Sequence, residues 1–328
     1  MSSNQGVALL LGQLMSFAIT GTGVTSQLLA QRHNVNIPTT QSGVNYLLLA
    51  IVYSLVLLKQ GKLRETITSI SKMKYYFLLA FIDVEANFLV VKAYQYTNIT
   101  SITLLDCFSI PCVVLFTGLF LKTRYNLRHI LGVILCIGGL AILVYSDINT
   151  LNVDSKEKLI GDVLCLAGAL LYAVSNVGAE AFSKKYNRVE YLAMVGSFGT
   201  LVSLVQIGIF ERSIFGGFEW SWDIASLLIA FTACLFLVYS VLPIALILGG
   251  SALLNLSLLT SDVFAIITSI FLFKAELNFT FYIAFTVILL GLLCYNIKNE
   301  LHSEPDNNPP KEDTTNESHE SPSNLHIY

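Results

Sequence analysis

The chain has 328 residues, of which 54% are hydrophobic and only 12% are charged, and its mean hydropathy is +0.67. Soluble domains carry about 25% charged residues, so this composition excludes a soluble globular protein and indicates an integral membrane protein. The formal net charge of −3 arises from an acidic C-terminal tail and gives no reason to expect a nucleic-acid partner.

Apolar segments recur ten times along the chain. Each holds about 20 residues, the length that crosses roughly 30 Å of hydrocarbon as a helix. Pro111 and Pro243 fall inside two of the segments and are expected to kink them. The sequence therefore predicts an all-α polytopic membrane protein with ten transmembrane helices, at about 7–30, 38–58, 75–96, 99–121, 127–146, 159–182, 190–210, 224–247, 251–273 and 279–297.

A weak repeat accompanies these segments. Lys122, Asn126, Gly139 and Leu140 recur at a shift of 152 residues as Lys274, Asn278, Gly291 and Leu292. Because each half holds an odd number of spans, the two halves must insert upside down relative to each other, as in many secondary transporters. We expect a first five-helix repeat at 7–146, a non-cytosolic loop at 147–158 and a second five-helix repeat at 159–297.

The loop charges predict the orientation. With the N-terminus inside, the cytosolic loops hold eleven Lys and Arg residues and the opposite loops hold five. The positive-inside rule then places both termini in the cytosol, with residues 1–6 as a short N-terminal segment. Residues 298–328 carry acidic side chains and four prolines without an apolar face, so we expect a disordered cytosolic tail.

Charged residues inside the apolar segments are the candidates for function. Asp83, Glu85 and Lys92 lie in segment 75–96, Asp106 lies in the next segment, and Asp262 is centred in the ninth. An ionised group near the bilayer centre costs roughly 2.5–3.5 kcal/mol on insertion scales. Such groups usually face one another or a water-filled cavity, so they mark a substrate or ion pathway.

Glu85 and Lys92 are seven residues apart and share a helical face. Glu85 is a candidate ligand for a substrate or a coupling proton, or else half of a buried ion pair. Asp83, with Asn87 four residues on, is a candidate of the same kind or part of a structural polar stripe. Lys92 and Asp106 lie toward the non-cytosolic ends of adjacent helices, where they could form a gating or structural salt bridge or contact the substrate.

Asp262 belongs to the half opposite Glu85, as expected for a cavity between two repeats. Asn255 lies seven residues before it, and other spans add the polar side chains of Tyr94, Tyr96, Tyr172, Ser175, Asn176 and Tyr239. The polar side chains of these other spans either bind the substrate or make ordinary interhelical hydrogen bonds, worth about 0.6 kcal/mol on average.

Motifs of enzymes are absent from the sequence. It contains no G-x-x-x-x-G-K-[ST], no H-E-x-x-H and no G-x-S-x-G, and its six cysteines lie inside spans without metal-like spacing. We expect no cofactor, no metal and no catalytic activity. A membrane transporter and a non-transporting receptor or scaffold remain as the two classes of function.

Several strings resemble the F branch of solute carrier family 35 over residues 8–297. The matching strings are Asp83-Val-Glu-Ala-Asn87, Lys92-Ala-Tyr-Gln-Tyr-Thr97, Thr100-Ser101, Leu104-Leu-Asp-Cys-Phe108 with Ile110-Pro111, Gly161-Asp162, Leu171-Tyr-Ala173 with Ser175-Asn-Val177, and Met194-Val-Gly196 with Phe198-Gly-Thr200. A departure from the family pattern is Lys92, where Arg is usual.

The resemblance implies the drug/metabolite transporter fold, with two inverted five-helix halves around a central cavity. It implies a monomer or homodimer in the plasma membrane or in a Golgi or endosomal membrane. Relatives carry nucleotide sugars, whereas some members of the F branch are associated with the base queuine and its nucleoside queuosine. Four acids against one base inside the helices favour a neutral or cationic solute, because a nucleotide sugar needs its phosphates neutralised.

Overall fold

The computed structural model describes residues 3–62, 66, 70–120, 126–149, 155–185, 187–217, 220–275 and 277–296. Within these ranges the chain forms helices and no strand, which confirms the predicted all-α class. The expected tail at 298–328 lies outside the described residues. The helices are α1 (Ser3–Gln27), α2 (Pro38–Lys59), α4 (Ile70–Ala93), α5 (Ile99–Asp106), α6 (Ser109–Phe120), α7 (Leu127–Asn149), α8 (Ser155–Lys185), α9 (Arg188–Gln206), α10 (Trp222–Phe271) and α11 (Phe279–Asn296), with short π-helices η1 (Leu28–Arg32) and η2 (Ile207–Glu211) and a 3-10 turn η3 (Ile214–Gly216).

Seven described segments are long and apolar enough to cross a membrane, so the chain is an integral multi-pass membrane protein. The other three expected spans correspond to α4, to the second part of α10 and to α11. The α4 helix is long enough but carries Asp83, Glu85 and Lys92. All ten expected segments are therefore helical in the structure.

The fourth expected span is not one continuous helix. It is divided into α5 and α6 at Cys107 and Phe108, just before Pro111. Because Pro111 has no N–H, the Cys107 carbonyl loses its helical donor and instead accepts from Ile110 N at 3.1 Å. The kink expected at Pro111 is confirmed, while the uninterrupted helix expected over 99–121 is wrong. Asp106 consequently lies at the carboxyl end of a short helix.

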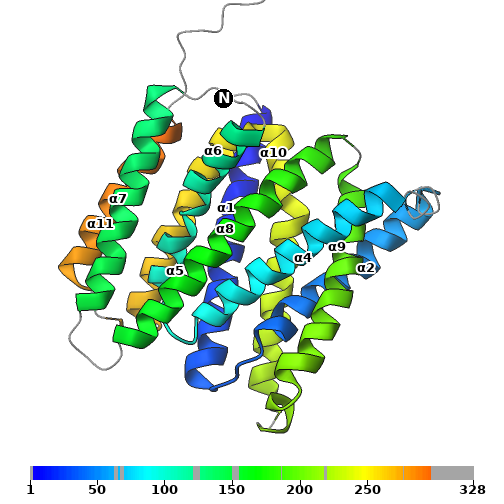
Figure 1. Ribbon diagram of the computed structural model, residues 1–328, viewed down its shortest axis with the longest axis horizontal. Helices are drawn as coiled ribbons and strands as arrows, with labels where there is room; N and C mark the ends of the chain where they lie inside the picture. The colour runs from blue at the N-terminus through cyan, green and yellow to red at the C-terminus, as the bar shows by residue number, and fades with distance from the viewer. Residues whose placement is uncertain are drawn as a thin grey trace, which may run out of the picture. The chain divides into compact units, whose positions relative to one another are not determined.

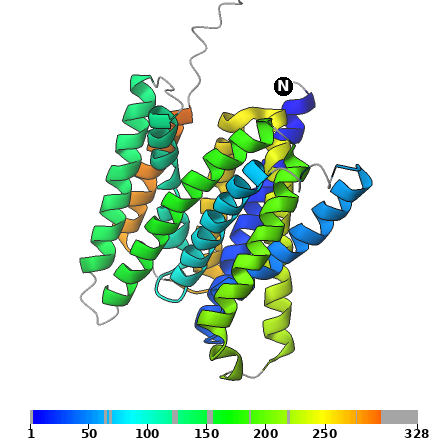
Figure 2. The same cartoon turned by 45° about the vertical axis from the view of Figure 1, so that its right-hand side comes forward.

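The α10 helix, although continuous from Trp222 to Phe271, doubles back on itself. A Cβ added to Gly21 would lie 2.8 Å from Cys234 Sγ, and the neighbouring Thr20 hydroxyl donates to the Ser261 carbonyl at 3.3 Å. In a straight helix residues 234 and 261 would be about 40 Å apart at 1.5 Å per residue. Figures 1 and 2 show the two arms of α10 descending on either side of a bend. The two arms match the expected eighth and ninth spans.

The helices pack mainly in pairs. α1 lies against α10, α2 against α9, α4 against α8 and α7 against α11 (Figures 1 and 2). Glycines allow the close approach: a Cβ on Gly199 would lie 2.6 Å from the Tyr46 ring, and one on Gly291 would lie 2.8 Å from the Gly132 carbonyl oxygen. Such small-residue contacts are typical of membrane helices.

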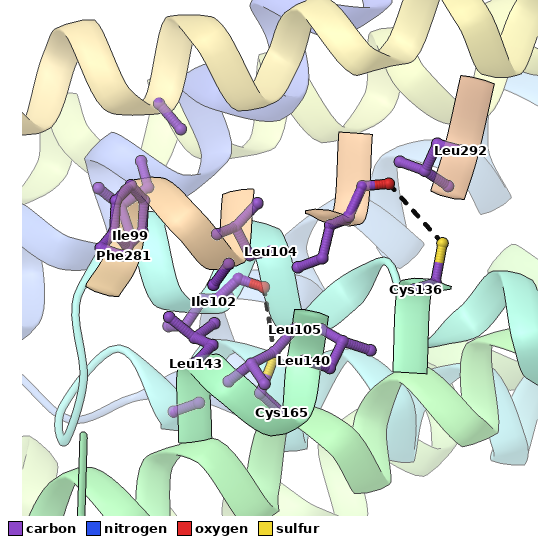
Figure 3. Close-up of a cluster of buried hydrophobic side chains, with 14 of the residues drawn as sticks. Ile99, Ile102, Leu104, Leu105, Cys136, Leu140, Leu143, Cys165, Phe281 and Leu292 are labelled. Carbon is purple, nitrogen blue, oxygen red and sulfur yellow. Dashed lines mark hydrogen bonds between the residues drawn. The ribbon is translucent and has the colours of Figure 1, made fainter. Parts of the chain in front are cut away.

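An apolar core joins α5, α7, α8, α10 and α11. Figure 3 shows Leu104 and Leu105 of α5 among side chains from α7, α8 and α11. The thiols of Cys136 and Cys165 point to the carbonyls of Ile288 and Ile102 at 3.8 and 3.5 Å. All six cysteines are free, as expected of cysteines that serve as small apolar residues.

A buried carboxylate holds the beginning of α2. Glu211, at the end of η2, is only 1% exposed and accepts hydrogen bonds from Thr39 N at 2.6 Å, Thr40 N at 3.0 Å and Thr40 Oγ1 at 2.5 Å. The positive end of the helix dipole stabilises the negative charge. Glu211 thereby fastens α9 and its π-helical extension to α2.

Candidate functional site

The most connected polar side chain inside the bundle is Asp83 on α4. It is 4% exposed. Its Oδ2 accepts hydrogen bonds from the hydroxyls of Tyr46 on α2 at 2.7 Å and Tyr239 on α10 at 2.5 Å. Its Oδ1 accepts from the Ser175 hydroxyl on α8 at 2.8 Å. One carboxylate therefore ties together four helices, two from each half of the chain.

Asn87, one turn along α4 from Asp83, also belongs to this hydrogen-bond network. Its Nδ2 lies 3.0 Å from the Asp83 carbonyl oxygen, which can only accept, so the amide NH₂ must face that way. The same Nδ2 lies 2.8 Å from the Tyr46 hydroxyl and 3.0 Å from the Tyr239 hydroxyl. The amide has two N–H groups for these three oxygens, so at least one N–H is shared, and each tyrosine hydroxyl also lies within hydrogen-bond distance of Asp83 Oδ2. The three hydroxyl groups around Asp83 are donors of the kind that a carboxylate accepts.

From the sequence, Asp83 was a candidate ligand or part of a polar stripe with Asn87, and nothing connected these two residues with Tyr46, Ser175 or Tyr239. The spacing of Asp83 and Asn87 was the available signal, because residues four apart share a helical face. The three hydroxyl donors come from distant parts of the chain, so no local pattern pairs them with Asp83. Only the packing of α2, α8 and α10 around α4 brings them together.

Glu85 lies on a different face of α4 from Asp83. At 100° per residue it projects about 20° from Leu78, which is 53% exposed, whereas Asp83 projects about 140° from it. Its Oε1 accepts a short hydrogen bond from Gln206 Nε2 on α9. Glu85 is therefore partly exposed on the flank between α4 and α9, and the structure does not bring it to the Asp83 network.

The salt bridge suggested for Lys92 and Asp106 does not form between these two described residues, since no such pair lies within 4.0 Å. Lys92 Nζ instead lies 5.3 Å from the centroid of the Phe88 ring, a cation–π distance. The ion pair found among the described residues joins Lys72 and Glu190 at 3.7 Å.

Asp106 and Asp262 lie beside the break between α5 and α6. Asp262, on the second arm of α10, is 6% exposed, and its Oδ2 lies 4.0 Å from the thiol of Cys107, the residue next to Asp106. The Oδ1 atom of Asp106 is buried without a hydrogen-bond partner. Two carboxylates from opposite halves thus lie near the same helix break, and no Lys or Arg among the described residues lies within ion-pair distance of either.

Two tyrosines lie around this pair of acids. Tyr172 on α8 is within electrostatic range of both Asp83 and Asp106. Tyr94, just past the end of α4, is 8% exposed and within range of Asp106. Tyr172 therefore lies in the neighbourhood of both the Asp83 network and the acidic pair. Of the predicted residues, Asp106, Asp262, Tyr94 and Tyr172 are brought to one region of the bundle.

Asn176 is exposed although it is on the inner side of α8. It projects roughly 220° around the helix from Val163, which is 57% exposed, and about 20° from Cys165, which faces the Ile102 carbonyl of α5. Asn176 is therefore exposed on the side of α8 that faces α5, away from the side of Val163. Tyr172 is one turn from it on the same face.

The remaining predicted residue is Asn255. It belongs to α10, but its side chain lies outside the described residues. Among the residues that are described, no group of three or more His, Cys, Asp and Glu side chains could hold a metal ion.

The comparisons with known proteins agree on one family. Residues 2–297 match the family model described as "SLC35F: Solute carrier family 35". The chain is 42% identical to mouse "Solute carrier family 35 member F2" over 289 residues, covering 87% of this chain and 77% of the relative. It is 39% identical to the Xenopus tropicalis protein of the same name over 294 residues, covering 87% and 75%.

A solved crystal structure is similar in fold, with a TM-score of 0.59 and 14% sequence identity, covering 88% of this chain and 95% of that chain.

Proposed function

Because the chain belongs to solute carrier family 35, a family of membrane solute transporters, we propose that it is a secondary transporter that works by alternating access. Its substrate is a small, neutral or cationic solute of the nucleobase or nucleoside type, such as queuine or queuosine. The observation that carries the charge preference is the meeting of Asp106 and Asp262 without a basic partner in ion-pair range among the described residues.

The proposed architecture is a pair of inverted five-helix repeats. If the two halves are related by a two-fold axis, every contact between them has a symmetry-related copy. A Cβ on Gly139 would lie 3.0 Å from the Ala284 carbonyl oxygen, and one on Gly291 would lie 2.8 Å from that of Gly132. If residues of the first half are moved forward by 152 positions and residues of the second half are moved back by 152, the first contact becomes the second. The same shift separates Cys136 from Ile288, whose atoms are in contact.

The contacts between α2 and α9 are exchanged in the same way when the shift is one residue larger. A Cβ on Gly43 would lie 3.1 Å from Ser203 Cβ, and one on Gly196 would lie 2.5 Å from Ala50 N. That shift converts one contact into the other. It also makes Tyr46 equivalent to Gly199, the residue that packs against its ring. Matched contacts in two separate helix pairs support the inverted repeat more strongly than the few identical residues do.

The acidic pair has a direct role in the proposed mechanism. Two nearby carboxylates without a cation are costly inside a membrane, and the negative end of α5 adds to the repulsion at Asp106. A cationic solute neutralises one carboxylate when it binds, and a coupling proton on the other would remove the remaining charge. Loading therefore lowers the cost of reorienting the halves. Asp106, Asp262, Tyr172, Tyr94 and Asn176 are the proposed substrate-contacting or proton-coupling residues.

Glu85, Lys92 and Asn255 complete the proposed set. Glu85 lies beside Gln206 on another face of α4, so its contribution would come from the flank between α4 and α9. We place both termini in the cytosol, in the plasma membrane or a Golgi or endosomal membrane, in a monomer or homodimer.

Queuine suits such a site because it joins a secondary ammonium to a flat, hydrogen-bonding ring, which carboxylates and tyrosine rings can bind. Its choice follows the resemblance to the F branch together with the charge balance. The test is uptake of labelled queuine and queuosine by cells that lack their own carrier, with and without this chain. Uptake of a nucleotide sugar, and of neither micronutrient, would contradict the proposal.

A further inference from the structure

We propose that the structure is open at the end of the bundle placed in the cytosol, and that the contact of Gly23 with Tyr94 and Ile99 is the gate that closes the other end. The inference rests on the proposed function, because it takes the two halves to be inverted repeats that exchange shapes during transport. Gly23 on α1 and Asn176 on α8 are then equivalent residues. In each state of the cycle one of them is covered and the other is exposed.

Contacts with neighbouring helices fix which residues of α1 and α8 are equivalent. A Cβ on Gly168 of α8 would lie 2.5 Å from Val90 Cγ2 of α4. Moving Gly168 back by 153 positions and Val90 forward by 152 gives Met15 of α1 and Leu242 of α10, which pack in one apolar cluster. The same shift of 153 relates α2 to α9, and it places the end of η1 on the end of α8.

The shift of 153 makes Gly23 equivalent to Asn176, but the two residues have opposite surroundings. Gly23 is buried, and a Cβ there would lie 2.8 Å from the Tyr94 hydroxyl oxygen and 2.7 Å from Ile99 Cδ1. Asn176, in contrast, is exposed on the side of α8 that faces α5. The end of α1 is therefore packed against the residues that link α4 to α5, whereas α8 is uncovered at the corresponding level of the opposite end.

Two pairs of equivalent segments show the same asymmetry. Residues 79–82 of α4 and 231–234 of α10 agree in burial position by position, so the two helices start alike. Beyond them, buried residues of α4, and of α1 with η1, have more exposed equivalents in α10 and α8, and no described position over 83–93 shows the reverse. The pairs are Asp83 and Leu235, Val84 and Phe236, Ala86 and Val238, Asn87 and Tyr239, Val91 and Pro243, Gly23 and Asn176, Thr25 and Gly178, Ser26 and Ala179, and Leu29 and Phe182.

The more exposed members lie toward the end that we place in the cytosol. Figure 1 shows the bend of α10 and the end of α8 toward the top, as is the N-terminus of the chain. The contact at Gly23 belongs to the opposite end, where α1 ends and α5 begins. Because Gly23 has no side chain, Tyr94 and Ile99 can pack directly on α1. In the opposite state α8 is covered at Asn176 and the contact at Gly23 is open.

The experiment follows two introduced thiols in the purified full chain without solute. Asn176→Cys reports on the open end, and Thr25→Cys reports on the closed end because Thr25 is 7% exposed. Labelling by a maleimide is measured above that of the parent chain with its own cysteines. Asn176→Cys should react at least about tenfold faster than Thr25→Cys, as expected if the open state dominates the population.

Gly23→Val should reverse this order. Its side chain does not fit between α1 and Ile99, so the gate cannot close and the opposite state is favoured. Labelling of Asn176→Cys should fall, and that of Thr25→Cys should rise, each at least about fivefold. Gly6→Val is the matched control on the same helix: a Cβ there meets nothing within 4 Å, so either rate should change less than about twofold. If Gly23→Val does not fold, Gly23→Ala replaces it, since the Cβ alone makes the close contact.

Two results would overturn the inference. One is equal labelling of the two thiols when Gly23 is intact. The other is faster labelling of Thr25→Cys in Gly23→Val without slower labelling of Asn176→Cys, which would show that one end loosens without closing the other. Failure of the proposed function is distinguishable from both. Reversed labelling in a protein that takes up no queuine would contradict the solute and leave the gate standing.

Discussion

The carboxylate of Asp83 on α4 accepts the hydroxyl proton of Tyr239 on α10, so a single hydrogen bond joins the first half of the chain to the second. The acid lies inside the bundle, whereas its near neighbour Glu85 lies on the flank beside Gln206. Two acids separated by one residue on α4 therefore have different surroundings, and substitutions of the two should have different effects.

The acidic pair supplies the first prediction. Asp106→Asn and Asp262→Asn should each leave the protein in the membrane but reduce transport at least tenfold, which corresponds to about 1.4 kcal/mol. The carboxamide keeps the shape of the side chain and removes the charge that would meet a cation. Initial uptake rates, normalised to the amount of protein in the membrane, measure the effect.

The Glu85→Gln variant tests whether Glu85, on the flank between α4 and α9, takes part in transport. If Glu85 contacts the solute, this variant should also lose at least tenfold in transport. Full activity would assign Glu85 to packing against Gln206 and would remove it from the proposed site. The same uptake assay, run beside Asp106→Asn, distinguishes the two roles.

Glu211 caps the beginning of α2, so removing its carboxylate should lower the stability of the protein. Glu211→Ala removes the acceptor of two backbone N–H groups and one hydroxyl at a buried helix end, so the free energy of unfolding should fall by about 1.5–3 kcal/mol. Asp223→Ala is the matched control, because Asp223 lies exposed in the first turn of α10 and should change stability by less than about 0.5 kcal/mol. Thermal unfolding in detergent, followed for both variants, compares them; equal losses would show that the cap adds nothing.

Two adjacent glycines test the packing of α7 on α11. A Cβ at Gly139 would lie 2.6 Å from Ile288 Cγ1, whereas one at Gly138 would meet nothing within 4 Å. Gly139→Val should therefore lower the yield of folded protein and cost about 1–3 kcal/mol, and Gly138→Val should be tolerated. Size-exclusion profiles and melting temperatures provide the comparison. Tolerance of both substitutions would mean that the two helices are not packed as described.

Topology is a further prediction. Tag or cysteine-accessibility mapping should find both termini in the cytosol and the loops at 147–158 and 211–223 on the other side. The reason is the excess of Lys and Arg in the loops placed inside. An odd number of crossings between two loops placed on one side would contradict the inverted repeat.

Much of the fold could be predicted from hydropathy, because a helix must hide its backbone polar groups from lipid and a run of about 20 apolar residues does so. The ten segments follow from this rule. The division of the fourth span at Cys107 could be predicted only as a kink at Pro111, since the length of the break depends on local hydrogen bonds. Likewise, the bend of α10 after Pro243 separates two segments that hydropathy had already distinguished.

The candidate site was less accessible to sequence reasoning. Charge inside a span identified Asp106 and Asp262, but charge gives no direction in space, so it could not separate Asp83 from Glu85 or show that Lys92 lies over Phe88. The sequence presents Ser175 and Tyr239 only as polar groups within spans and gives no reason to single out Tyr46. Their connection to Asp83 depends on how four helices pack, which a local pattern does not contain.

The central claim is that this chain carries a small cationic or neutral nucleobase-type solute across a membrane. The most direct measurement is the uptake of labelled queuine into liposomes that contain only the purified protein, beside liposomes that contain Asp106→Asn/Asp262→Asn. We predict saturable uptake by wild type, competition by queuosine and a loss of at least tenfold in the double variant. No uptake above that of empty liposomes, or uptake of a nucleotide sugar instead, would contradict the account.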